Sequence, residues 1–196
     1  MAIENKQASG HHNGEDHSGR QTQMYLRFGA MILTAMVVMY AAMFAGTYAW
    51  DHVRWSESRL FMTLTMGGTM GLVMLAWMLN MYRNTTMNLV IVAVSLLLLA
   101  AGVYLDRSQT TVGDVSFNSA MIPHHSLAIT RSERAQITDA RVCDLAVEIS
   151  ESQRREILEM DWLNEDIRRN GVAATRAEAE ARPVPDFEVA AERECP

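Results

Sequence analysis

Three long stretches without a charged side chain constrain this chain more than any other feature of its sequence. They are residues 28–50, 60–82 and 84–105, and none contains Lys, Arg, Asp or Glu. Each is 22 or 23 residues long, which is enough for a helix to cross a hydrocarbon core of about 30 Å. The sequence therefore predicts an all-α protein with three transmembrane helices in its first half, and the lipid bilayer is its first expected partner.

The predicted spans divide the chain into four parts. Residues 1–23 are polar and are expected to be a disordered tail, because they cannot bury a hydrophobic core. The tail contains His11, His12 and His17, which are either incidental or a metal-gathering arm. Residues 24–106 form the membrane domain and residues 107–170 a helical hairpin. Residues 171–196 form a flexible C-terminal tail, since Pro183 and Pro185 interrupt any helix there.

The cations near the spans predict the orientation of the chain. Counting only Lys and Arg, as the positive-inside rule requires, four lie on the N-terminal side and three on the other. We therefore expect a cytoplasmic N-terminus and a periplasmic or extracellular C-terminal domain, in a bacterial inner or plasma membrane. The two groups are Lys6, Arg20, Arg27 and Arg83 against Arg54, Arg59 and Arg107.

Methionines recur every four residues along the second stretch, beside the pair Gly67 and Gly71. Such methionines either fill gaps between helices or form a thioether ladder for Cu(I), and packing is the favoured interpretation. No predicted span carries a charge, which argues against an ion-coupled transporter. We expect the spans to act as an anchor. The methionines are Met62, Met66, Met70, Met74 and Met78.

The hairpin is predicted from its caps and its periodicity. Asp114 is expected to cap a helix over residues 115–136 that bends near Pro123. Asp139 is expected to cap a second helix that ends at Asn170, before Gly171. On helical wheels each helix carries one stripe, and we expect the two stripes to face each other. The stripes are Phe117, Met121, His124, His125, Ala128 and Ser132, and Val142, Leu145, Ile149, Gln153, Glu156, Met160, Leu163 and Ile167.

The polar residues within these stripes indicate a metal site. A carboxylate such as Glu156 is costly in a core unless something pairs with it, and His124, His125 or a shared cation can do so. Thioether and imidazole ligands suit copper better than calcium or magnesium, and the spacing does not fit a closed zinc site. The alternative is a structural network of His124, His125 and Glu156 that fixes helix packing without a metal.

The same residues carry a family resemblance. The run from Phe117 to Ile129, with Met121-Ile122-Pro123-His124-His125 at its centre, and the run Gln153-Arg154-Arg155-Glu156-Ile157 with Met160 resemble the domain of unknown function 305 family over about residues 112–168. The resemblance implies a ferritin-like helical module that is often membrane-anchored and, in some members, binds copper. It implies Met121, His124, His125, Glu156 and Met160 as ligands, with Gln153 in support. Many members carry Gln and Met where this chain has Ser126 and Arg131.

A two-helix hairpin of this size struggles to bury a core of its own. The ferritin-like resemblance implies that two hairpins combine into a four-helix bundle, so we expect a homo-oligomer formed through the hairpin, with a copper donor or acceptor protein as a further partner. Glu156 is the one inner carboxylate, and Glu-x-x-His motifs of a di-iron site are missing from the sequence. We therefore expect a copper-sequestering or copper-transferring protein rather than an enzyme.

Charge and cysteine usage narrow the function further. Residues 107–196 contain 11 Lys or Arg and 17 Asp or Glu, a net charge of −6 that does not suit nucleic acid. Cys143 and Cys195 are far apart in sequence and form neither a disulfide framework nor a zinc signature. Cys143 is expected to be a small core residue.

Overall fold

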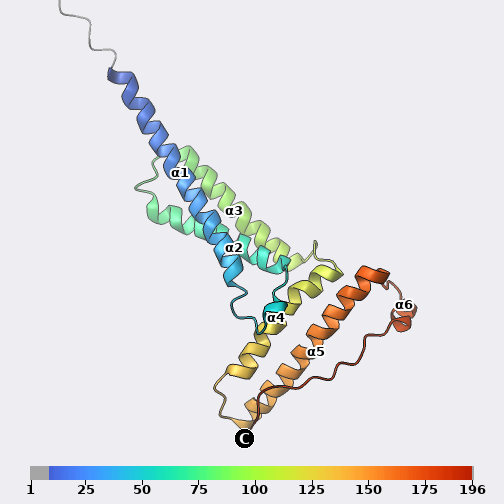
Figure 1. The fold of residues 1–196 in the computed structure, drawn as a ribbon. Coiled ribbons are helices and arrows are strands. Elements are labelled where there is room, and N and C mark those ends of the chain that lie inside the picture. The colour runs from blue at the N-terminus through green and yellow to red at the C-terminus, as the bar shows by residue number, and fades with distance from the viewer. Residues whose placement is uncertain (1–8, 196) are drawn as a thin grey trace, which may run out of the picture. The chain divides into compact units, whose positions relative to one another are not determined.

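The computed structural model describes residues 9–195, with side chains from Gly19 onward. This part of the chain is all-helical and contains no strand, as predicted. Figure 1 shows the order of the elements. They are α1 (Ser9–Ala42), the 3₁₀ helix η1 (Trp50–His52), α2 (Glu57–Met78), α3 (Thr85–Ser108), α4 (Asp114–Arg134), α5 (Ala140–Asn170) and α6 (Arg176–Ala181).

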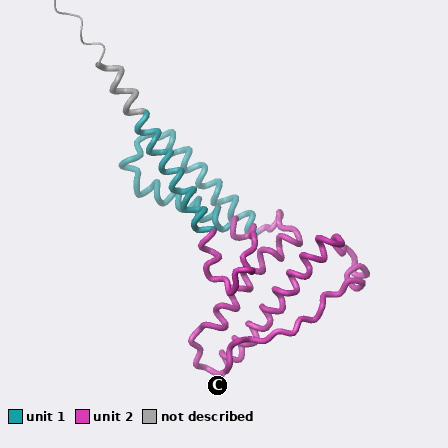
Figure 2. Tube along the Cα trace, viewed as in Figure 1, with its two compact units in different colours: residues 1–40, 61–107 teal, residues 41–60, 108–196 magenta. Residues whose placement is uncertain are grey.

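The chain forms two compact units (Figure 2). The first contains α1 up to Tyr40 and residues 61–107, and the second contains residues 41–60 and 108–196. The boundary differs from the predicted membrane domain of residues 24–106, because the first loop and the start of α2 pack with the hairpin. Residues 1–8 of the predicted disordered tail lie outside the described part of the chain. Residues 9–23, expected to be disordered, belong to α1.

Three helices of the first unit are long and apolar enough to cross a membrane. They are Gly19–Ala42, Glu57–Met78 and Thr85–Ser108, with mean hydropathies of 1.6, 1.5 and 2.4. The first ends eight residues before the predicted Trp50, because turns replace the helix after Ala42. Gly46 lies in this turn region, where a Cβ atom would meet the Leu127 side chain at 2.6 Å.

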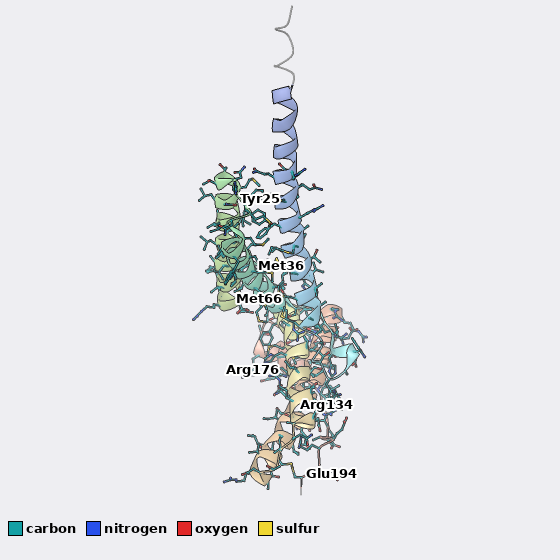
Figure 3. The ribbon with its side chains drawn as sticks, turned by 90° about the vertical axis from the view of Figure 1, so that its left-hand side faces the viewer. Tyr25, Met36, Met66, Arg134, Arg176 and Glu194 are labelled. Carbon is teal, nitrogen blue, oxygen red and sulfur yellow. A yellow bond between two sulfur atoms is a disulfide. The ribbon has the colours of Figure 1, made fainter. Side chains whose placement is uncertain are left out.

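Small residues and methionines pack the first unit. A Cβ atom on Gly68 would lie 2.5 Å from the Ser95 carbonyl oxygen, so α2 and α3 approach closely at this glycine. The sulfur of Met36 packs on Gly67, and Figure 3 marks Met36 on α1. Three methionines of the predicted ladder, Met70, Met74 and Met78, pack against the aromatic core, as the packing interpretation requires, whereas Met62 and Met66 are exposed.

The second unit is built on the predicted hairpin of α4 and α5. The Asp139 side chain accepts a hydrogen bond from the Arg141 backbone N–H at 3.0 Å, which confirms this N-cap. Gly171 ends α5 with a φ of 79°, which also confirms the prediction. Gly113, not Asp114, is the N-cap of α4, and α4 ends at Arg134 rather than Gln136. The helix continues through Pro123.

The stripes that we predicted to form the core lie about a quarter turn away from most of the residues that are buried. The contact between α4 and α5 is made mainly by residues next to those stripes, and several of them are small or polar. Asn118 donates to Asn164 across this contact at 3.1 Å. Periodicity of large apolar residues does not detect such a core, because Ser, Asn and Ala scarcely register as hydrophobic. The buried residues include Asn118, Ile122, Ser126, Ile129, Cys143, Ala146, Ser150, Ile157, Met160 and Asn164.

The first loop covers one side of the hairpin. Ser126, which is fully buried, accepts a hydrogen bond from the Tyr48 backbone N–H at 2.7 Å and lies 2.8 Å from His52 Nδ1. The buried Arg59 side chain donates to the Pro123 carbonyl at 3.2 Å and to the Met43 carbonyl at 2.6 Å. His52 is therefore a packing residue rather than part of a solvated loop.

The C-terminal segment lies along the hairpin, contrary to the flexible tail we predicted (Figure 1). Cys143 and Cys195 form a disulfide, so the expectation that they remain unpaired is wrong. Arg193 donates to the Ser132, Glu133 and Ala135 carbonyls at the end of α4, at 2.6, 3.0 and 2.5 Å. These contacts satisfy carbonyls that a helix end leaves without partners.

Candidate functional site

The two predicted stripes share one face of the hairpin, which we call the open face. At about 100° per residue, the α5 stripe is centred about 90° from Ile157, on the side away from Arg154, Leu158 and Asp161. The latter residues face the first loop, since Arg154 lies over the Tyr48 ring and Arg54 pairs with Asp161. Large apolar side chains remain exposed on the open face. They are Phe117, Val142, Leu145 and Ile149.

His125 and Glu156 meet on the open face. Nδ1 of His125 lies 2.9 Å from Oε2 of Glu156, and the two side chains are 12% and 40% exposed. The distance fits an ion pair, but the pair does not meet hydrogen-bond geometry. Nδ1 of His125 is consequently the one buried side-chain nitrogen or oxygen in the described part of the chain without a hydrogen-bond partner. Buried polar atoms are rarely left in this condition, and a ligand would account for it.

Neighbouring residues hold Glu156 in place. Gln153 Nε2 donates to Glu156 Oε2 at 3.3 Å, and the Ser152 hydroxyl donates to Oε1 at 2.9 Å. Gln153 therefore helps to orient the Glu156 carboxylate. The carboxylate is oriented from its own helix, so its second oxygen is directed toward α4.

Two methionines lie one helical turn away from this pair. Met121 precedes His125 by four residues on α4, and Met160 follows Glu156 by four residues on α5, so each shares a face with its neighbour. Met160 belongs to the hairpin core together with Ile122, Ile129 and Ile157, and Met121 packs against this cluster. The structure thus brings four of the predicted site residues into one region.

His124 is not part of this inner group. Its ring is exposed, and its centroid lies 6.0 Å from that of His125 in an edge arrangement. Adjacent residues on a helix are about 100° apart, so the two rings of a His-His pair cannot point in the same direction. His124 borders the open face, where it is available to a molecule that docks there.

Burial favours the neutral form of the His125 ring. Desolvation lowers the pKa of His125 below its ordinary value, and the neighbouring His124 lowers it further, while Glu156 acts in the opposite sense. A neutral imidazole with a free ring nitrogen is the form that binds metals.

The side chains at the open face limit which metals could bind there. The described part of the chain contains no group of three or more His, Cys, Asp or Glu residues arranged to hold a metal. One hairpin therefore offers one imidazole, one carboxylate and two thioethers at the open face. This set does not fit a closed zinc site, but it fits a soft ion such as Cu(I), which accepts thioether ligands.

A second polar cluster was not detected in the sequence. The Glu133 side chain is 5% exposed, accepts a hydrogen bond from the Ser150 hydroxyl and lies 3.3 Å from Nη2 of Arg154. Burial would raise the pKa of Glu133, but hydrogen bonds from Ser150, the Glu192 backbone and Arg154 outweigh it and hold the pKa below its ordinary value. No periodic signal links Glu133 to the other two residues, because Glu133 lies on α4 whereas Ser150 and Arg154 lie on α5.

Ser126 of α4 lies beside His52 of the first loop, and His52 lies beside Asp51, which is the spatial order of a serine–histidine–aspartate triad. Ser126 lies 2.8 Å from His52 Nδ1, and His52 Nε2 lies 3.9 Å from Asp51. A nucleophilic serine must be reachable by its substrate, whereas Ser126 is fully buried and bonded to the Tyr48 N–H. This arrangement attaches the loop to α4 and does not form a catalytic triad.

Comparison with known proteins identifies the family. A family model described as a domain of unknown function, DUF305, matches residues 114–192, which include α4, α5 and the C-terminal segment. The chain is 30% identical over 139 residues to the uncharacterized protein L153 of Acanthamoeba polyphaga mimivirus, covering 67% of this chain and 90% of that protein. The chain belongs to the DUF305 family. No solved structure matches it.

The family match reaches beyond the resemblance noted in the sequence. That resemblance covered about residues 112–168, whereas the DUF305 match extends to residue 192. The additional residues are those that lie along the hairpin and end next to Cys195. The C-terminal segment is thus part of the DUF305 module, together with the site on the open face.

Proposed function

We propose that this DUF305 protein is a membrane-anchored, non-enzymatic metal-binding protein that holds copper outside the cytoplasm and exchanges it with a donor or acceptor protein. The ligands would be His125, Glu156, Met121 and Met160, with Gln153 orienting the carboxylate. When bound, the metal would satisfy the imidazole nitrogen and link the middle of α4 to the middle of α5.

The observation that carries this proposal is the unsatisfied Nδ1 of His125. It is buried, lies 2.9 Å from a carboxylate oxygen and has no hydrogen-bond partner in the described structure. A buried polar atom without a partner is costly. Two thioethers one turn away, one on each helix, supply soft donors, which makes copper the metal that the donor set suits best.

We further propose that a second copy of the hairpin docks on the open face. One chain offers few donors there, and the exposed apolar side chains around them would be covered by a second pair of helices. A four-helix bundle with inward-facing ligands is a common metal-binding architecture. In such a dimer His124, at the border of the open face, can reach the partner chain.

The proposed location outside the cytoplasm has independent support. The Cys143–Cys195 disulfide is typical of oxidising compartments and rare in the cytosol. The N-terminus would then be cytoplasmic, since three spans place the two ends of the membrane domain on opposite sides. Three helices of suitable length and hydropathy support membrane anchoring.

The competing function is structural. In that case His125, Glu156, Gln153 and Ser152 form a polar network that fixes helix packing or oligomerisation without a metal. The contacts of Glu156 with Ser152 and Gln153 favour this alternative. The lack of a partner at His125 Nδ1 argues against it, because a network selected for packing gains from being fully satisfied.

The test is Cu(I) affinity of the full chain in detergent, measured by competition with a chromophoric chelator. His11→Asn, His12→Asn and His17→Asn form the background, so that the N-terminal histidines do not contribute. His125→Asn is expected to weaken binding by at least about tenfold, equal to about 1.4 kcal/mol. Met121→Leu with Met160→Leu is expected to do the same while preserving packing.

Two matched controls separate ligands from bystanders. His124→Asn changes the adjacent exposed ring and should leave the affinity of the monomer unchanged. Met87→Leu changes an exposed methionine of α3 and should have no effect. Absence of Cu(I) binding, or equal loss in His124→Asn and His125→Asn, would refute the proposed ligand set. A drop in metal-free stability of His125→Asn without any metal effect would establish the structural alternative.

A further inference from the structure

The C-terminal segment 183–195, which we call the strap, has no regular structure and lies along the hairpin from α6 to Cys195 (Figure 1). We propose that the strap is a redox-controlled clasp: the Cys143–Cys195 disulfide holds it closed, and reduction by a dithiol protein releases it from the hairpin. This inference is independent of the proposed metal site, since it concerns the opposite side of α5.

The strap's contacts are concentrated near the disulfide. Arg193 donates to three carbonyls at the end of α4, and the Glu192 backbone N–H donates to Glu133 Oε1 at 3.0 Å. The Glu192 carboxylate pairs with Arg154 at 3.1 Å, and the Ala191 N–H donates to Glu151 at 3.4 Å. Each of these contacts is made by a strap residue within four positions of Cys195, so the disulfide holds all of these residues close to the hairpin.

Closing the strap completes two features of the hairpin. Arg193 caps the C-terminus of α4, where a cation also complements the helix dipole. Val189 and Ala190 form one wall of a cavity of about 360 Å³, whose other walls include Tyr48, Ile129, Arg154 and Ile157. Release of the strap would remove the cap and take away the wall that Val189 and Ala190 give to this cavity.

The noncovalent contacts alone would hold the strap only weakly. Glu192 is 64% exposed, so its ion pair with Arg154 is screened by water. The remaining contacts are hydrogen bonds of a segment with no helical or strand pairing, and ordering each residue opposes them. The covalent bond keeps the strap at high effective concentration over its binding surface.

The redox step is a thiol–disulfide exchange. A thiolate of the reducing dithiol attacks Sγ of Cys195, which is partly exposed, whereas Cys143 is 2% exposed. The Cys143 sulfur leaves as a thiolate and takes up a proton. The second thiol of the reductant then attacks the mixed disulfide, releasing Cys195 as a thiol. Two electrons and two protons pass to the cysteines, and the reductant becomes a disulfide.

The experiment is amide hydrogen exchange of the full chain in detergent, before and after treatment with reduced thioredoxin as the dithiol probe. Reduction is expected to speed exchange of the Ala191 and Glu192 amides by at least about tenfold without unfolding the centre of α5. The matched control is the double variant Cys143→Ala, Cys195→Ala. Its strap amides should exchange as fast as those of the reduced protein and should not respond to thioredoxin.

A further variant tests whether the disulfide is the fixed point. Arg193→Ala keeps both cysteines and removes the three contacts of the Arg193 side chain to the end of α4. It should leave the Ala191 and Glu192 amides protected in the oxidised protein and exposed after reduction. Two results would overturn the proposal: unchanged strap protection after complete reduction, or a disulfide that thioredoxin reduces only when urea has unfolded the hairpin.

Discussion

Replacing Arg154 with Met removes the cation that faces a nearly buried carboxylate while keeping an apolar stem of similar length. In the structure Nη2 of Arg154 lies 3.3 Å from Glu133 Oε1, and the two side chains are 20% and 5% exposed. The guanidinium also lies 4.7 Å from the centre of the Tyr48 ring. The variant leaves Glu133 with the Ser150 hydroxyl and the Glu192 N–H as partners, but without a neutralising charge.

The expected cost follows from the separation of the charges. At an effective dielectric constant of about 20, two unit charges at this distance attract each other by about 5 kcal/mol, an upper bound because desolvation opposes it. Breaking a buried pair by removing one partner costs about 3–5 kcal/mol. Because Arg154 retains some access to water, we expect the lower end, about 3 kcal/mol.

The assay is native-state hydrogen exchange of the α4 and α5 amides in the detergent-solubilised full chain, which reports the free energy of opening for this unit alone. A double-mutant cycle with Glu133→Gln isolates the pair. We expect the double variant to be more stable than the sum of the single effects predicts, by about 2 kcal/mol. A cost below about 1 kcal/mol for Arg154→Met, with no coupling to Glu133→Gln, would mean that water screens the pair and would refute the reasoning.

Three further predictions test other parts of the chain. The pKa of Glu133 is held below its ordinary value of 4.5 in the folded protein. The stability that ionised Glu133 contributes is therefore complete above about pH 4.5 and is lost as the pH falls through the folded pKa. Measured as unfolding free energy against pH, Glu133→Gln should flatten the decline between about pH 5 and 3. Arg59→Met removes the donors to the Met43 and Pro123 carbonyls and should lower the opening free energy of α4 by about 2–3 kcal/mol in the same hydrogen-exchange measurement. The control Arg107→Met, at an exposed position, should have little effect. Gly68→Ala would place a Cβ atom 2.5 Å from the Ser95 carbonyl oxygen and should lower the thermal stability of the first unit in detergent. In the control Gly29→Ala the Cβ atom meets nothing within 4 Å, so the thermal stability should be unchanged or higher.

Local chemistry in the sequence predicted the elements of the hairpin well. Asp139 and Gly171 mark the ends of α5 because a capping carboxylate and a residue with positive φ act within their own turn. Length and hydropathy likewise predicted the three long apolar helices. These features depend on neighbours in the sequence, so no knowledge of the tertiary structure is needed to detect them.

Features that depend on distant segments were not predictable in this way. The Cys143–Cys195 disulfide joins residues 52 positions apart, and the strap that carries Cys195 has no period to detect. The contact between His125 and Glu156 was predicted, but its placement was not, because the pair lies on an open face rather than in the core. The helical wheel grouped these residues on one face of each helix, but it assigned that face to the core, about a quarter turn from the residues that are buried.

The distribution of polar contacts over the hairpin explains why the stripe is open. On the side that faces the first loop, the polar groups of the hairpin have partners. Ser126 accepts a hydrogen bond from the loop, and the Pro123 carbonyl accepts one from Arg59. Arg154 forms ion pairs with Glu133 and Glu192. The side with Met121, His125 and Glu156 differs: within the described residues, the partners of Glu156 are Ser152 and Gln153 of its own helix and His125 of α4. The hairpin is thus satisfied on one side, and on the other it has a buried nitrogen without a hydrogen-bond partner and exposed apolar residues. This asymmetry is the physical reason why we propose that side for both the metal and the second hairpin.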